Sequence, residues 1–387
     1  MFVKITRMLR TLFSGAKLAG SEETSIVAGG EHIAEVPAGT GAGGGRFDCT
    51  GLTLFPGFID VHIHGAMGID VNVADVDGLL KIGKFLARNG VTAWMPTLVP
   101  DSDESYARVI AAIGLLMEIQ DTEPVARAIG VHYEGVFANE KMCGALRPQF
   151  FKKFPEDQLS QLPKLNRGVH MMTYAPEVGG GIGLTRELER QGWIASIGHT
   201  RADVSTLEKA FEAGARHLTH FYNAMTGLHH RDVGVVGWAL TQPDVTFDII
   251  ADGIHVHPKM LEFACRAKGT ENVSLISDSI SAAGMGDGEF EIWDEKISVT
   301  NGRTQNERGS IAGSVISMLD AVKRMRSLGF SDGEVSRMAS GNPARLIGLQ
   351  DELGSLTPGQ RADFVGLDGQ GNVRLTVVGG RVVFDGR

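Results

Sequence analysis

From residue 54 onward, short apolar runs alternate with stretches whose apolar residues recur every three or four positions. The first kind is typical of buried strands and the second of amphipathic helices. Strand-like runs occupy residues 54–64, 91–99, 128–134, 169–175, 193–199, 216–222, 245–251 and 273–279. Helical stretches occupy residues 76–89, 106–119, 184–191, 204–213, 258–266, 314–328 and 332–339. This alternation predicts an α/β fold with a (β/α)8 barrel. A doubly wound sheet is the alternative, but no Gly-x-Gly-x-x-Gly follows the first strand.

The two ends of the chain have a different pattern. Residues 1–54 and 350–387 contain short apolar pieces, Phe2–Ile5 among them, and residues 39–45 form a glycine-rich tip. Short strands joined by loose turns fit this composition better than helices. We therefore predict one small β-sandwich domain built from residues 1–54 and 350–387, and a barrel domain of residues 55–349. A hairpin arm is also expected at Glu289–Val299.

The first barrel strand, within Pro56–Gly65, ends in two histidines. Because side chains alternate along a strand, Ile59, Val61 and Ile63 are expected on one face, packed against helices. The opposite face would carry Phe58, Asp60, His62 and His64. Two imidazoles two residues apart at a strand end can converge on one cation. Core histidines held by hydrogen bonds are the alternative for this pair taken alone.

Other strands also end in residues that bind metals. The full set is His62, His64, Glu134, His199, His220 and Asp278. Barrel enzymes place their sites at the carboxyl ends of the strands, so these side chains are expected to meet there. Imidazole and carboxylate ligands suit a divalent cation, with Zn²⁺ expected first and Fe²⁺ as the alternative. A site without thiolates indicates catalysis, in which Asp278 could accept a proton from water and pass it to a leaving amine.

Composition and charge narrow the class of ligand and the cell compartment. The 387-residue chain has a net charge of -9 and no run of lysine and arginine, which argues against nucleic acid as a partner. An anionic ligand would need a local basic group, and Arg231 could grip a phosphate with its guanidinium if it is not simply a solvated loop residue. Three scattered cysteines, no signal-peptide pattern and no membrane-length apolar run predict a cytoplasmic protein.

Several motifs resemble the amidohydrolase superfamily. The first-strand segment Pro56–Gly65, the segment Ser340–Arg345 and the Gly-x-Leu-x-x-Gly-x-x-Ala-Asp pattern of Gly354–Asp363 are similar to its signatures. Further segments resemble one branch of it, the N-acetylglucosamine-6-phosphate deacetylases. They are His132–Gly135, Gly198–Thr200, Thr219–Met225, Ala251–Val256 and Ile311–Ser314.

The resemblance implies a function and roles for individual residues. The expected reaction is metal-dependent hydrolysis of the acetamide of N-acetylglucosamine 6-phosphate, with Asp278 as the acid/base. Glu134, His199 and His220 would bind the main metal; His62 and His64 allow a second, with Glu134 bridging. Substrate contacts are implied for Ala145, Asn223, Ala224, His230, Arg231, Asp252, His255, Ile311, Ala312 and Gly313. Arg231 is expected to reach the phosphate of a neighbouring subunit in a homodimer.

The sequence departs from this branch at Leu146, where its members carry histidine or glutamine. That side chain donates a hydrogen bond to the acyl oxygen, and loss of such a donor typically costs ~100- to 1000-fold in turnover. The metal could act alone, a neighbour such as Arg147, Asn139 or Lys141 could donate instead, or the substrate could differ. Val136 in place of proline, and Ser277 and Ser279 around Asp278, are lesser departures.

These departures keep other functions open. One alternative is an amidohydrolase that acts on a different N-acyl sugar, with or without phosphate, or on a cyclic amide. Another is a weakly active homologue that binds metal. Retention of Asp278 argues against the last, whereas Leu146 argues for it.

Overall fold

The computed structural model describes residues 10–35, 45–155 and 158–387. The predicted strand at Phe2–Ile5 and most of the glycine-rich tip lie outside these ranges. Within them, no helix combines the length and the apolar character that are needed to cross a membrane.

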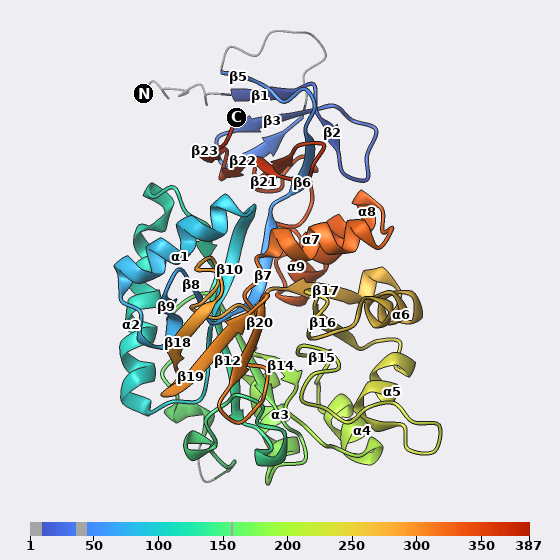
Figure 1. Ribbon diagram of the computed structural model, residues 1–387. Coiled ribbons are helices and arrows are strands. Elements are labelled where there is room, and N and C mark those ends of the chain that lie inside the picture. Colours follow the sequence, from blue (N-terminus) through green and yellow to red (C-terminus); the bar gives the residue numbers. More distant parts are fainter. Residues whose placement is uncertain (1–9, 36–44, 156–157) are drawn as a thin grey trace, which may run out of the picture.

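In the part of the chain that the structure describes, a barrel of eight parallel strands is present, as predicted (Figure 1). Its strands are β7 (Phe58–Ile63), β10 (Val91–Leu98), β12 (Gly130–Phe137), β13 (Val169–Tyr174), β14 (Ile194–Ile197), β15 (His217–Leu218), β16 (Thr246–Ile250) and β17 (Val273–Ile276). Each pairs with the next in chain order. The last and first strands meet just past their ends, where the Asp278 amide donates to the His62 carbonyl at 2.9 Å.

Helices surround the barrel and follow the predicted stretches closely. They are α1 (Val76–Arg88), α2 (Asp103–Ile119), α3 (Gly181–Arg190), α4 (Val204–Glu212), α5 (Gly234–Thr241), α6 (Pro258–Lys268), α7 (Met318–Ser327), α8 (Asp332–Ser336) and α9 (Asn342–Leu346). Side-chain caps fix several starts; Asp75, Ser102 and Asp203 each accept a hydrogen bond from a backbone amide of the first turn. The pattern missed two helices, α9 and α5; residues 234–239 of α5 are all buried, so no polar face marks that helix.

The first strand does not alternate as strictly as predicted. Ile59 and Val61 share an apolar cluster with Met95, Met171 and other residues of the barrel strands, and with Ala344 of α9, and therefore lie inside the barrel rather than against the helices around it. Ile63 does join the outer cluster. The pairing of β7 with β10 shifts register between Asp60 and Ile63, which is a β-bulge. The bulge turns His62 into the barrel mouth although Val61 before it also points inward.

Both ends of the chain contribute to a pair of small sheets above the barrel (Figure 1). One sheet has the order β4 (His32–Ala34), β3 (Ser25–Gly29), β1 (Arg10–Ser14), β5 (Arg46–Asp48). The other has the order β2 (Lys17–Leu18), β6 (Thr53–Pro56), β21 (Phe364–Leu367), β22 (Val373–Val378), β23 (Arg381–Asp385). Residues from both sheets, such as Phe13 and Phe364, share one apolar cluster. The exact domain boundaries remain a prediction.

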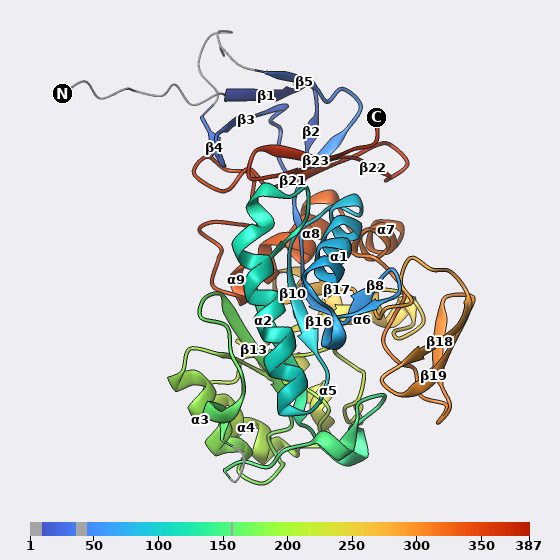
Figure 2. The same cartoon turned by 90° about the vertical axis from the view of Figure 1, so that its left-hand side faces the viewer.

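An arm of three antiparallel strands projects beside the barrel (Figure 2). It consists of β18 (Gly288–Ile292), β19 (Glu295–Thr300) and β20 (Arg303–Asn306); the last was not predicted. Trp293 and Asp294 form the first turn with φ values of 56° and 62°. Shorter strands are β8 (Gly65–Ala66), β9 (Ile69–Asp70) and β11 (Arg127–Ala128).

Candidate active site

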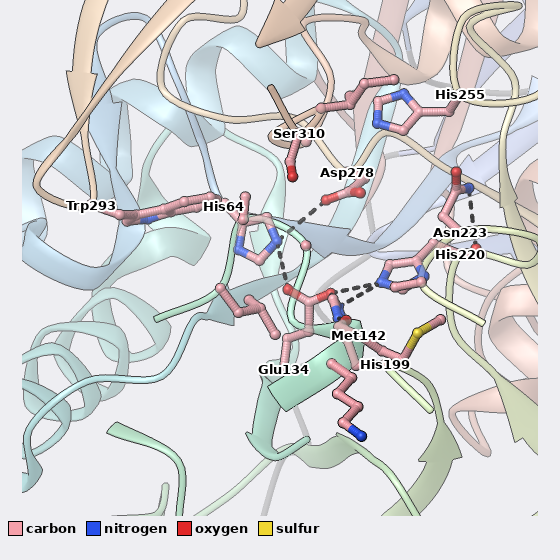
Figure 3. Close-up of a pocket in the computed structure, with 17 residues that line it drawn as sticks. His64, Glu134, Met142, His199, His220, Asn223, His255, Asp278, Trp293 and Ser310 are labelled. Atoms are coloured by element: carbon pink, nitrogen blue, oxygen red, sulfur yellow. Dashed lines mark hydrogen bonds and ion pairs between the residues drawn. The ribbon is translucent and has the colours of Figure 1, made fainter. Parts of the chain in front are cut away.

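A cavity of about 400 Å³ lies at the carboxyl ends of the barrel strands (Figure 3). Its lining combines strand-end residues with loop residues and the tip of the arm. The lining residues are His64, Glu134, Lys141, Met142, Gly144, Ala145, Leu146, His199, His220, Asn223, Ala224, His255, Asp278, Trp293, Ser310, Ile311 and Gly313. The metal-binding residues were predicted at this end of the barrel.

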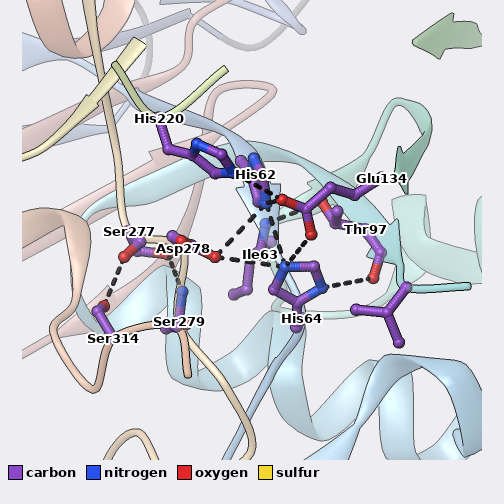
Figure 4. A network of polar contacts seen from close by, with 12 residues as sticks. His62, Ile63, His64, Thr97, Glu134, His220, Ser277, Asp278, Ser279 and Ser314 are labelled. Carbon is purple, nitrogen blue, oxygen red and sulfur yellow. Dashed lines mark hydrogen bonds and ion pairs between the residues drawn. The ribbon is translucent and has the colours of Figure 1, made fainter. Parts of the chain in front are cut away.

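Two groups of buried ligand-type side chains meet beside this cavity. Glu134, His199 and His220 form one triad, and His62, His64 and Asp278 form the other. The Oε1 atom of Glu134 lies 3.1 Å from His199 Nε2 and 2.9 Å from His220 Nε2. Its Oε2 atom lies 3.1 Å from His64 Nε2 in the second triad (Figure 4). Oε1 also lies 3.4 Å from His62 Nε2, so the carboxylate of Glu134 contacts both triads.

The donor atoms fit a divalent cation at each triad. Within a triad, the potential ligand atoms lie within 4.8 Å of one another. Facing Nε2 atoms approach to 3.0 Å between His199 and His220 and to 3.1 Å between His62 and His64, so their lone pairs need a shared proton or a cation. The Nδ1 atoms of His199 and His64 face backbone carbonyls of Met142 and Thr97. Donation from Nδ1 leaves Nε2 free to bind metal.

Charges inside the cluster shift the pKa values of the candidate ligands. Burial would raise the pKa of Glu134, but the imidazoles of His62, His199 and His220 hold it well below its usual range. Burial would lower the pKa of His64 and His220, yet the neighbouring carboxylates raise them to about 10 and about 9. Without a cation, the imidazoles of His64 and His220 thus retain protons that balance the carboxylates. Metal binding would replace those protons.

Three of the candidate metal-binding residues, His199, His220 and Asp278, have left-handed backbone conformations. The φ values are 48° at His199, 36° at His220 and 48° at Asp278. Non-glycine residues adopt such values rarely, and they cluster at functional sites. Each of these residues lies two positions beyond the end of its strand, so β14, β15 and β17 are shorter than the sequence predicted. The turned backbone directs each side chain over the barrel mouth.

Buried carboxylates position the ligand segments from behind. Asp248 accepts a hydrogen bond from the His220 amide, and its other oxygen lies 3.2 Å from His217 Nε2. Asp60 accepts from the Ser277 hydroxyl at 2.6 Å and thereby fixes the turn that carries Asp278. The His220 and Asp278 segments are therefore held by side chains as well as by the sheet.

The structure brings most of the predicted site residues together. Of the predicted substrate contacts, the cavity lining includes Ala145, Asn223, Ala224, His255, Ile311 and Gly313. Asp252 lies behind His255 and contacts its Nδ1 atom at 2.6 Å, while Ala312 is fully buried. His230 and Arg231 do not line this cavity. They contact each other, and Arg231 lines a separate surface hollow beside Arg201.

Sequence reasoning missed Met142, Gly144, Trp293 and Ser310 as lining residues. Of the three replacement donors considered for Leu146, two have other partners. All three nitrogens of Arg147 are engaged, by the Pro100 carbonyl, Asp101 and Asp294. The Asn139 amide donates to Glu177 at 2.8 Å, whereas Lys141 lines the cavity. A tryptophan at the tip of the expected hairpin arm was the available sequence signal for Trp293.

The barrel and its buried histidine–carboxylate cluster define a metal-dependent hydrolase. The amidohydrolase family profile matches residues 53–383. The chain is 37% identical to N-acetylgalactosamine-6-phosphate deacetylase of Escherichia coli O157:H7, over 81% of this chain and 83% of that protein. It is 35% identical to N-acetylglucosamine-6-phosphate deacetylase of Vibrio furnissii, over 86% of this chain and 84% of that protein. The solved Mycobacterium smegmatis N-acetyl-D-glucosamine-6-phosphate deacetylase, in complex with N-acetyl-D-glucosamine-6-phosphate, superimposes with a TM-score of 0.84, 26% identity and coverage of 97% and 99%. The chain belongs to the N-acetylglucosamine-6-phosphate deacetylase branch of the amidohydrolase family.

Proposed function

We propose that this enzyme hydrolyses the acetamide of N-acetyl-D-glucosamine 6-phosphate, giving glucosamine 6-phosphate and acetate in amino-sugar catabolism. The observation that carries the proposal is the pair of buried triads joined by Glu134 at the barrel mouth, in a chain of this family. Amide hydrolysis needs an activated water, a polarised acyl group and a proton donor for the leaving amine. The site has residues suited to each need.

The proposed roles follow from the positions of the side chains. Glu134, His199 and His220 would hold the main cation, and His62, His64 and Asp278 a second one. A bound divalent cation supplies Lewis-acid polarisation of the acyl oxygen and activation of water. Asp278, with 6% of its surface exposed, opens onto the cavity and would accept a proton from water and deliver it to the amine nitrogen. Asn223, the backbone at Ala224 and His255 would contact the sugar.

A second candidate substrate, N-acetylgalactosamine 6-phosphate, is also supported. The N-acetylgalactosamine-6-phosphate relative is as similar to this chain as the N-acetylglucosamine-6-phosphate one. The two sugars differ only in the configuration at C4. The test is to measure free amine released from both sugar phosphates, and from unphosphorylated N-acetylglucosamine, by metal-loaded protein. A higher kcat/KM for the glucosamine derivative is expected, and no release from any of them would overturn the proposal.

Arg231 is the proposed phosphate ligand, acting in the neighbouring subunit of a homodimer. The side chain is exposed and lies outside the cavity of its own chain, which supports action on another subunit. Two large apolar side chains on the same segment, Leu228 at 59% and Val233 at 42%, are also exposed and would be covered in a dimer. A symmetric dimer would place this segment of each chain at the other chain's site.

Replacing Arg231 by alanine is expected to raise KM for the sugar phosphate about 10- to 100-fold, the value of a charged hydrogen bond. Hydrolysis of the unphosphorylated sugar should be unchanged, and Arg201→Ala is the matched arginine control. At substrate concentrations well below the native KM, equal amounts of the Arg231→Ala and Asp278→Asn proteins should regain roughly a quarter of native activity after subunit exchange, because mixed dimers contain one intact site. Failure to regain activity would show that Arg231 does not act across the dimer.

The proposal also covers the identity of the native metal and the cell compartment of the protein. Zn²⁺ is proposed as the native metal, at one or two ions per subunit, because imidazole nitrogen and carboxylate oxygen are its usual ligands at catalytic sites. A cytoplasmic location is proposed because none of the three cysteines forms a disulfide.

A further inference from the structure

We propose that the acyl chain of the substrate packs against an apolar wall formed by Leu146 and Trp293, so that these two side chains determine which acyl groups are hydrolysed. The inference rests on the proposed deacylation and adds an acyl subsite to it. Leu146 and Trp293 both line the cavity and belong to one apolar cluster. We call this pair the acyl wall.

Leu146 is anchored next to a metal ligand. It is 3% exposed and packs with Val99 and Ala138, which are buried behind it. Its Cδ1 atom lies over Gly135, the residue after Glu134; a Cβ atom at Gly135 would fall only 2.2 Å from it. The glycine therefore permits the leucine side chain to lie directly beside the Glu134 segment. A well-packed side chain in this place presents a fixed surface.

Trp293 comes from the tip of the arm and completes the wall. Its ring meets His64 edge to face, with ring centroids 5.3 Å apart. Arg147, which is ion-paired to Asp101 at 2.6 Å, also reaches Asp294 at 3.4 Å and so ties the arm to the Leu146 loop. The Trp293 Nε1 atom is shielded from solvent and has no partner among the described residues. The indole therefore offers no accessible N–H group to a molecule in the cavity.

The surface that Leu146 and Trp293 present has no accessible hydrogen-bond donor, which decides how an acyl group fits against it; Lys141 is the candidate donor that remains elsewhere in the lining. Leu146 cannot donate, and Arg147 and Asn139 are bound elsewhere. A carbonyl oxygen placed against the wall would lose hydrogen bonds to water without replacement, whereas an alkyl group would gain from burial there. The alkyl end of the acyl group therefore faces Leu146 and Trp293. Its oxygen faces the metal-binding residues.

The experiment measures kcat/KM for the N-acetyl, N-propionyl and N-butyryl forms of glucosamine 6-phosphate with metal-loaded native enzyme and variants. Leu146→Ala opens the wall and should raise the butyryl-to-acetyl ratio about tenfold, since one methylene in an apolar pocket changes kcat/KM ~10- to 200-fold. Trp293→Leu should shift the ratio in the same direction, and it serves as the second variant if Leu146→Ala does not fold. Leu146→His should lower the ratio by adding a polar group.

Met142→Ala is the matched control, because Met142 lines the cavity across from Trp293 (Figure 3). It should change kcat/KM by the same factor for every acyl chain. Acyl ratios that stay constant in both wall variants, while native enzyme is active, would overturn the acyl wall alone. If the native enzyme hydrolyses none of the three, the proposed reaction is wrong. Affinity of the Asp278→Asn protein for the same series then decides whether the wall binds acyl chains.

Discussion

Replacing Asp278 by asparagine should lower kcat about a thousandfold, within the range that a positioned acid/base contributes. The amide keeps the size of the carboxylate but can neither accept a proton from water nor deliver one to the departing amine. The backbone of this residue is fixed by the Ser314 amide, which donates to the Asp278 carbonyl at 2.7 Å, so the side chain should keep its position. Free amine released from the sugar phosphate measures the effect.

The triad of Glu134, His199 and His220 does not include Asp278, so the variant should retain the main metal. Metal content measured on the same sample separates lost catalysis from lost metal. Asp363→Asn is the matched control, because Asp363 is also buried but lies in the small domain, directly before β21, where it accepts from the Gly379 amide. Full turnover in Asp278→Asn would remove this residue from the mechanism and leave another group as the proton carrier.

The sequence could predict the ligands because they follow from two simple regularities. Apolar runs of strand length mark the barrel strands, and the carboxyl ends of parallel barrel strands meet at one rim. Any polar residue that follows such a run is therefore brought near all the others. His62, His64, Glu134, His199, His220 and Asp278 were predicted on this basis, and the structure places all of them in the two triads.

The local backbone of the site was not predictable in the same way. His220, Tyr222 and Ala224 have positive φ values, yet none is a glycine that would mark a turn. The alternation of polar and apolar residues in this segment resembles that of an extended strand. Contacts from other elements, such as the hydrogen bond that Asp248 accepts from the His220 amide, hold its backbone in the turned conformation. The bulge in β7 likewise arises from its pairing with β10, which hydrophobic alternation does not record.

The apolar side of the cavity was not predictable from local patterns either. Leu146 stood out only as a departure from related sequences, with no indication of what replaces the missing donor. The structure shows that Trp293, from a distant arm, packs in the same cluster. Contact between residues so far apart in the chain depends on how the arm packs, with Ile292 and Ile297 in one apolar cluster with Ile280.

Replacing Glu134 by glutamine should abolish tight metal binding and lower activity at least about 100-fold. Mutating a residue that only supports a metal ligand typically costs about 10- to 100-fold, and Glu134 is itself a proposed ligand. Glu134 contributes one oxygen to His199 and His220 and the other to His64, so its loss affects both triads. An amide retains one oxygen but no charge, and two cations close together need an anion between them. Metal content after dialysis, together with amine release, measures the result.

His64→Asn separates the two triads, because His64 belongs only to the one with His62 and Asp278. If two cations bind to the native enzyme, this variant should retain one and Glu134→Gln should retain none. If only the main site is occupied, His64→Asn should bind as much metal as native enzyme. Retention of native metal content in Glu134→Gln would show that the imidazoles alone hold the cation, and Glu134 would then no longer be the residue that joins the two sites.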